Sequence, residues 1–132
     1  LRELAADYGV RQRVHLIGVI RPVNALRERA KLFVLSSRWE GFGNVVVEAL
    51  VAGVPVVSTD APGGPRAILN DGEYGHIVPV DSPGELASAM MEALDRPRGT
   101  KDARRRRANE YLPRAVASRY LCEALAIDER NP

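Results

Sequence analysis

Two glutamates flank a glycine-containing loop in the first half of the chain. Glu40 directly precedes Gly41, Gly43 follows two residues later, and seven residues separate Glu40 from Glu48. Because glycine has no side chain, the backbone at this loop can pass close to a ligand. Carboxylates are repelled by phosphate but accept hydrogen bonds from vicinal hydroxyls, such as those of a ribose or a sugar. The residue types therefore favour a ligand that carries hydroxyls on either side of a charged centre.

A helix is expected to begin near Asn44, directly after this loop. The free N–H groups and partial positive charge of its first turn suit a phosphate. Glu48 lies one turn inside, and helical side chains lean toward the N-terminus, so it can reach the same cleft. A diphosphate on the amides, with hydroxyls on Glu40 and Glu48, describes a nucleotide-sugar. The alternative is that the glycines only form a turn and that the glutamates are exposed residues at a helix end.

Short apolar runs alternate with amphipathic segments along the chain. We expect strands at residues 13–17, 32–35, 54–57 and 76–80. We expect helices at residues 1–9, 22–30, 44–52, 65–70, 83–96 and 102–127, the last interrupted at Pro113. This alternation is typical of α/β proteins with a Rossmann-like parallel sheet and flanking helices. Ligands of such sheets bind beyond the carboxyl ends of the strands, in the loops at residues 18–22, 36–45 and 58–65.

Local signals refine these expectations. Ser82 and Glu85 form a predicted capping box, with Pro83 at the first helical position. The polar residues 58–60 follow a strand, where they either line the cleft or cap the next turn, and capping is the commoner role. The arginine cluster at residues 104–107 is interpreted as a solvated helix face rather than a phosphate or lipid contact.

Composition excludes several classes of protein. The chain has 132 residues, 45% of them hydrophobic, and a net charge of +2, as expected for one globular domain at most. Basic residues are not concentrated in either half, which argues against a nucleic-acid partner. One cysteine excludes an internal disulfide, and two histidines argue against a zinc site. With no apolar leader or membrane-spanning run, we expect a cytoplasmic location, with peripheral contact to the inner face of the membrane as an option.

From about Val14 to Val80 the sequence resembles the retaining GT-B glycosyltransferases of family 4 type, also called group 1. The motifs that carry the resemblance are Leu16-Ile17-Gly18, residues 30–37, residues 40–48, residues 52–57, Gly63-Gly64-Pro65 and residues 71–78. The Pro62–Arg66 version is similar to bacterial polysaccharide transferases. Where many relatives have glutamate after Gly-Gly-Pro-Arg, this chain has Ala67.

The resemblance implies a role for each matching residue. Glu40, the catalytic candidate, would accept hydrogen bonds from the donor sugar, and Glu48 from the ribose. The donor-binding residues that offer backbone amides to sugar and diphosphate would be Gly41, Phe42, Gly43, Asn44 and Val45. Those that lie along the nucleobase would be Val19, Ile20 and Arg21. No cofactor and no metal are expected, since basic residues and helix amides would carry the phosphate charge.

The resemblance also implies an organisation. Residues 1–97 would be a partial, N-terminally truncated GT-B C-terminal domain, and residues 98–132 a C-terminal helical segment. In the strand order 3-2-1-4-5-6 of that family, residues 13–17 would form the third strand, at an edge. A missing N-terminal domain would bind the glycan or lipid-linked acceptor, so this chain alone is expected to be inactive.

Two alternatives to a glycosyltransferase remain open. One is an inactive remnant or nucleotide-binding module. The other is a nucleotide-sugar epimerase on the same scaffold, against which the spacing of Glu40 and Glu48 argues.

Overall fold

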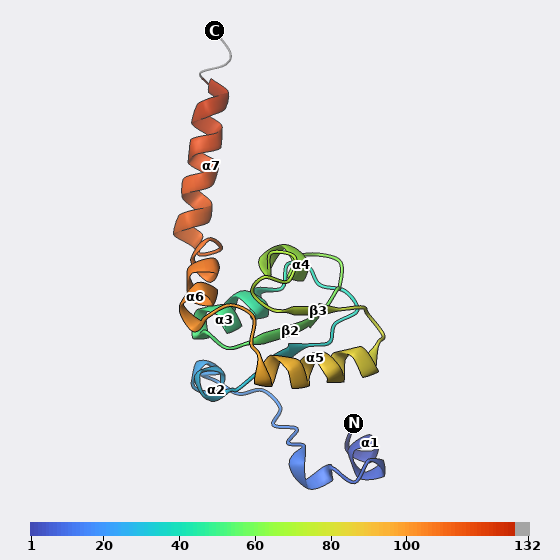
Figure 1. Ribbon diagram of the computed structural model, residues 1–132. Coiled ribbons are helices and arrows are strands. Elements are labelled where there is room, and N and C mark those ends of the chain that lie inside the picture. Colours follow the sequence, from blue (N-terminus) through green and yellow to red (C-terminus); the bar gives the residue numbers. More distant parts are fainter. Residues whose placement is uncertain (129–132) are drawn as a thin grey trace.

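The computed structural model describes residues 1–128, which form helices on both faces of a small parallel sheet (Figure 1). The strands are β1 (Phe33–Leu35), β2 (Val56–Thr59) and β3 (His76–Val78). The helices are α1 (Arg2–Asp7), the 3-10 turn η1 (Arg11–Arg13), α2 (Asn24–Arg29), α3 (Asn44–Ala52), α4 (Pro65–Ile68), α5 (Pro83–Asp95), α6 (Lys101–Asn109) and α7 (Pro113–Asp128). The expected α/β architecture with a parallel sheet is confirmed.

The sheet has the order β1-β2-β3, and both pairings are parallel. Val34 pairs with Val57, and Val57 pairs in turn with His76. All four residues of β2 are buried, as expected for the central strand of a sheet covered on both faces. The carboxyl ends of β1 and β2 therefore lie side by side.

Alternating side chains of the strands divide the core into two clusters. Val56 faces the apolar side of α3, including Val46 and Leu50, together with residues of α4 and α6. Val57 and Val78 face the opposite side, where they contact α5. This two-faced burial follows from the period of two along a strand. It fixes α3, and with it the loop before α3, against one face of the sheet.

The predicted strand at residues 13–17 is wrong. Arg11–Arg13 form the 3-10 turn, and the following residues lie outside the three-stranded sheet and are exposed. A strand needs a neighbour to take up its backbone N–H and C=O groups. Among residues 1–128 no strand pairs with this segment, so its alternating pattern produces only an extended connection.

The helices begin and end close to the predicted residues, but the predicted capping hydrogen bonds differ from those in the structure. α5 begins after Ser82, as predicted, but the predicted capping box is wrong, because the Ser82 hydroxyl makes no capping bond and lies 3.5 Å from the Val80 carbonyl. α6 does have a side-chain cap, since Thr100 Oγ1 accepts a hydrogen bond from the Ala103 N–H at 3.1 Å. The interruption before Pro113 is confirmed.

The interpretation of residues 104–107 as a solvated helix face is wrong for two of the four arginines. Arg104 is only 4% exposed, and its guanidinium donates hydrogen bonds to the carbonyls of Gly53, Arg98 and Gly99. Burial lowers the pKa of Arg104. Arg107 binds carbonyls at the end of α4, whereas the two arginines between them are exposed. A helix thus uses its basic residues to cap the ends of its neighbours.

Two further expectations concern the whole chain. The division after residue 97 stays a prediction, although α6 packs against α3. Within residues 1–128, no helix is both long enough and apolar enough to cross a lipid bilayer.

Candidate functional site

Two loops meet beyond the carboxyl ends of β1 and β2. The Glu40 N–H donates a hydrogen bond to the Pro62 carbonyl at 3.0 Å. Gly63 has φ +119°, and a Cβ atom at this position would lie 1.8 Å from the Glu40 carbonyl oxygen. A Cβ atom on Gly64 would lie 2.1 Å from the Phe42 carbonyl oxygen. Only glycine permits this backbone contact, so Gly63 and Gly64 set the path of the loop that contains Glu40.

A chain of hydrogen bonds fixes the Glu40 side chain. Thr59 Oγ1, in β2, donates to the Ser37 carbonyl at 2.5 Å and lies 3.3 Å from the Leu35 carbonyl. The Ser37 hydroxyl then donates to Glu40 Oε1 at 2.6 Å. The carboxylate has a second oxygen with which to accept a hydroxyl of a ligand. Sequence reasoning missed this role of Ser37 and Thr59, and only the spacing of three between Ser37 and Glu40 hints at it.

The polar residues 58–60, of which the first two end β2, support the fold rather than the cleft, apart from Thr59, which also lines a hollow with Ser36. Ser58 is fully buried and donates to the Thr59 carbonyl at 2.8 Å. Asp60 accepts from Arg66 Nε at 2.9 Å and Nη2 at 2.6 Å, across the start of α4. This hydrogen-bonded guanidinium holds the pKa of Asp60 below its ordinary value. Asp60 therefore holds the Arg66 side chain instead of capping a turn, because no side chain caps the start of α4.

The start of α3 faces the same two loops. Gly43 is the N-cap residue at φ +90°, and no side chain caps the helix there. The first N–H groups of a helix have no acceptor within the helix itself. Around them, Gly41, Phe42 and Asn44 are exposed and Val45 is half-buried. Of the five predicted amide donors, four are therefore at least partly exposed and Gly43 is buried.

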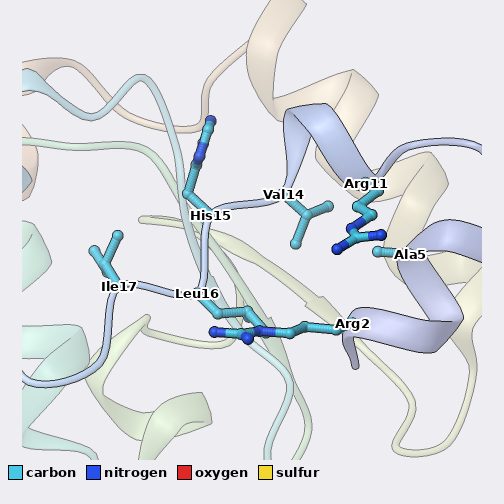
Figure 2. Close-up of a pocket in the computed structure, with 7 residues that line it drawn as sticks. All are labelled: Arg2, Ala5, Arg11, Val14, His15, Leu16 and Ile17. Atoms are coloured by element: carbon cyan, nitrogen blue, oxygen red, sulfur yellow. The ribbon is translucent and has the colours of Figure 1, made fainter.

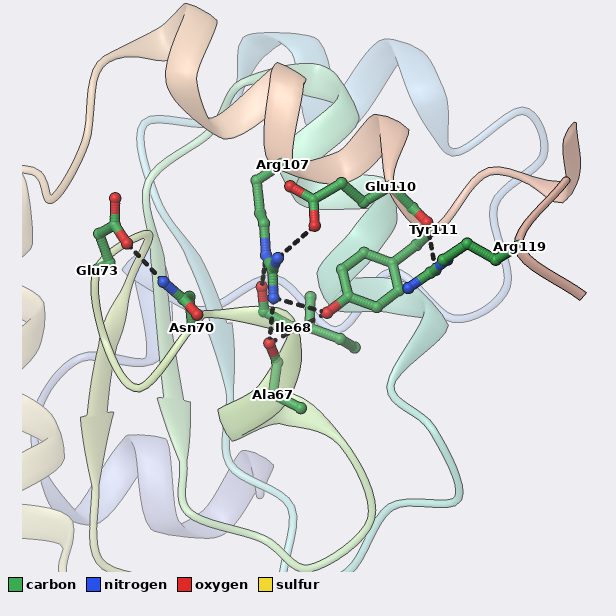
Figure 3. Close-up of polar contacts among 8 residues, drawn as sticks. All are labelled: Ala67, Ile68, Asn70, Glu73, Arg107, Glu110, Tyr111 and Arg119. Carbon is green, nitrogen blue, oxygen red and sulfur yellow. Dashed lines mark hydrogen bonds and ion pairs between the residues drawn. The ribbon is translucent and has the colours of Figure 1, made fainter. Parts of the chain in front are cut away.

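Arg107 and Tyr111 support this region from the other side of α4 (Figure 3). Arg107 donates to the carbonyls of Ala67 at 2.5 Å and Ile68 at 3.0 Å, and also to the Tyr111 hydroxyl. The Tyr111 hydroxyl donates to the same Ala67 carbonyl at 3.1 Å, and its ring lies 5.8 Å from that of Phe42. The α6–α7 junction therefore reaches the loop that contains Glu40.

Glu48 lies one turn into α3 and forms an ion pair with Arg27 of α2. Beside this pair is a cavity of about 350 Å³. It is lined by Arg27, Glu28, Glu48, Val51, Ala52 and Arg105. The two glutamates thus have different partners, Ser37 for Glu40 and Arg27 for Glu48. Sequence reasoning did not single out Arg27, because a charged residue in a short predicted helix carries no signal of its own.

The predicted nucleobase segment is an exposed loop before α2. Val19 is 90% exposed and Ile20 is 38% exposed, and Arg21 is exposed as well. Their contact with a base stays a prediction. A separate cavity of about 310 Å³ lies between α1 and residues 14–17 (Figure 2) and is lined by none of the predicted site residues.

A metal site in a protein needs several ligating side chains close together. Residues 1–128 contain no group of three or more histidine, cysteine, aspartate or glutamate side chains placed to hold a metal ion. The expectation that the reaction needs no metal stays a prediction.

Known proteins are similar to this chain in sequence. Residues 1–112 match the family described as glycosyl transferases group 1. The lipopolysaccharide core biosynthesis glycosyltransferase LpsE of Rhizobium meliloti is 35% identical over 94 residues, which are 71% of this chain and 27% of LpsE. The phosphatidyl-myo-inositol mannosyltransferase of Mycobacterium tuberculosis is 49% identical over 55 residues, which are 42% of this chain and 14% of that enzyme.

A solved structure shows the same architecture. The Anabaena protein Alr3699/HepE, crystallised in complex with UDP, superposes with a TM-score of 0.80 at 23% identity. The superposition covers 94% of this chain and 35% of HepE. The parallel sheet with helices on both faces is that of a GT-B glycosyltransferase domain. Since the family match covers residues 1–112, the chain belongs to the glycosyl transferases group 1 family.

Proposed function

We propose that this chain is the donor-binding part of a retaining, family 4 type glycosyltransferase. The enzyme would transfer a hexosyl group from a nucleotide-sugar to a glycan or lipid-linked acceptor in the synthesis of bacterial surface polysaccharide. The observation that carries the proposal is the contact between the loop at residues 40–43 and Gly63-Gly64. This contact fixes the backbone of the loop that contains Glu40 and leads directly into the uncapped start of α3.

Each part of the donor has a partner of matching chemistry. The amides of residues 41–45 would bind the sugar and diphosphate, since the start of a helix favours anions. Glu40 would accept hydroxyl hydrogen bonds from the sugar, and Glu48 from the ribose. The residues at 19–21 would lie along the base. Basic residues and amides would carry the phosphate charge in place of a metal, and the acceptor would bind to a separate domain.

The relatives support the reaction class. LpsE is named as a glycosyltransferase of lipopolysaccharide core biosynthesis. The mycobacterial enzyme is named as a mannosyltransferase for phosphatidyl-myo-inositol, which is a lipid. HepE was crystallised with UDP, which makes a nucleoside diphosphate the first ligand to test.

The experiment is donor kinetics of the protein that carries these residues. Glu40→Gln is expected to lower turnover more than donor affinity, and Glu48→Gln to lower donor affinity. Each would change by about tenfold or more, as for the loss of one charge-assisted hydrogen bond. Glu85→Gln, at the exposed start of α5, is the matched control. Wild-type kinetics in both site variants, or complete loss of transfer in EDTA that manganese restores, would contradict the proposal.

A further inference from the structure

Arg27 is a charged residue that the proposed mechanism has not used. It lies on α2, which packs against α3, and its side chain is only 16% exposed. Its guanidinium forms an ion pair with Glu48 Oε2, while the Glu48 side chain remains 47% exposed. The arginine is therefore the inner member of the pair, and the carboxylate is the member that a ligand can reach.

This arrangement solves an electrostatic problem at the proposed donor site. A nucleoside diphosphate carries negative charge on its phosphates, and a nearby unpaired carboxylate repels that charge. Without Arg27, Glu48 would be such a carboxylate, and Glu28 is a second carboxylate that lines the same cavity. A half-buried guanidinium beside Glu48 cancels much of its field, because partly buried pairs are screened little by salt.

The pair also restricts the direction of Glu48. A glutamate on a helix surface otherwise samples several rotamers, and holding it in one costs side-chain entropy. Because the ion pair with Arg27 already restricts the Glu48 side chain, less side-chain entropy is lost when the ligand binds. Arg105 lines the same cavity, but its side chain is exposed and comes from α6.

We propose that Arg27 is a positioning and charge-compensating residue, which directs Glu48 toward the ribose and lets a carboxylate coexist with the donor diphosphate. This inference rests on the proposed function. The compensation of charge affects only ligands with phosphates, so a diphosphate should lose more affinity than the same nucleoside without phosphates when Arg27 is replaced.

The test is calorimetric titration, at low salt, of the protein that carries residues 1–132. The wild type is titrated with UDP, GDP and ADP, and the tightest of these is paired with its nucleoside. Arg27→Gln is expected to lower diphosphate affinity by about tenfold and nucleoside affinity by less than about threefold. Arg27→Lys keeps the charge and should restore most of the diphosphate affinity. Arg29→Gln removes the same charge from an exposed position of α2 and is the matched control.

A double variant distinguishes charge compensation from a purely structural role of Arg27. In Arg27→Gln with Glu48→Gln, the diphosphate affinity should fall by less than the product of the two single losses, because the repelling carboxylate is gone. Equal losses for diphosphate and nucleoside in Arg27→Gln, or no loss, would overturn the inference. An Arg27→Lys variant that behaves like Arg27→Gln would also overturn it. A wild type that binds none of the three diphosphates would instead contradict the proposed function itself.

Discussion

Gly63 lies at the point where the two loops of the proposed site touch. Its φ of +119° is unfavourable for other residues, and a Cβ atom there would overlap the Glu40 carbonyl. Gly63→Ala should therefore lower the free energy of unfolding by about 2 kcal/mol or more and weaken donor binding. Urea unfolding measures the first effect. Gly84→Ala, where a Cβ atom meets nothing within 4 Å, should change stability by less than about 0.5 kcal/mol, and equal effects of the two variants would contradict the account.

His76 is a buried residue whose titration should be visible in stability. Its side chain is 4% exposed, and Nε2 has no hydrogen-bond partner within the described residues. Burial lowers the pKa of His76, Arg98 lowers it further, and Glu92, 3.7 Å from Nδ1, opposes the shift. The folded state thus binds this proton later than the unfolded state does as the pH falls. Stability contributed by neutral His76 is complete above about pH 6.5 and declines below it.

The measurement is urea unfolding of the wild type and His76→Leu between pH 7.5 and about pH 5. The wild type should lose up to about 1.4 kcal/mol per pH unit more than the variant below pH 6.5. Parallel pH profiles for the two proteins would show that His76 does not titrate differently on folding.

Among the elements, α6 holds the ends of its neighbours together through Arg104. The guanidinium binds the Gly53 carbonyl at the end of α3 at 3.1 and 2.9 Å, and two carbonyls of the turn before α6. Arg104→Gln leaves buried carbonyls unsatisfied and should cost about 2–4 kcal/mol of unfolding free energy. Arg106→Gln, at an exposed position of the same helix, should cost less than about 0.5 kcal/mol. Chemical denaturation of both variants checks this, and a neutral Arg104→Gln would show that the contact contributes nothing.

The sequence predicts elements well where local pattern decides them. α3 has the predicted bounds, and β1, β2 and β3 overlap the predicted strands, because short continuous apolar runs have few alternatives. Gly53 ends α3, and Gly75 and Pro79 lie on either side of β3. Residues 13–17 show the limit, since alternation alone does not say whether a partner strand exists. Arg104 shows another limit, because its burial depends on where α3 ends in space. Likewise, Glu40 and Glu48 are visible in the sequence, whereas their partners Ser37 and Arg27 emerge only from the packing of the loop and of α2.

On the scale of the whole molecule, apolar side chains are exposed at both ends of the described chain. Figure 1 shows α1 and the following connection on one side of the sheet and α7 projecting on another. Tyr8 is 75% exposed, Ile17 54%, Tyr120 71% and Leu121 64%. Exposed apolar groups of this kind favour association.

Residues 1–132 on their own should therefore self-associate with increasing concentration. They should also catalyse no sugar transfer, because the proposed acceptor site lies on a separate domain. Light scattering after size-exclusion chromatography measures the mass, and Ile17→Lys with Leu121→Lys should lower it. A monomer at every concentration that also transfers sugar would contradict this prediction.

The central claim is that a nucleotide donor binds where the loop at residues 40–43 meets α3. The most direct test is an amide chemical-shift map of the isotope-labelled protein, titrated with UDP and with the other nucleoside diphosphates. The account predicts that the largest shifts fall on residues 40–45 and on Glu48, and that Gly63→Ala removes them. Shifts centred on the cavity beside α1, or on β3 and α5, with residues 40–48 unchanged, would contradict it.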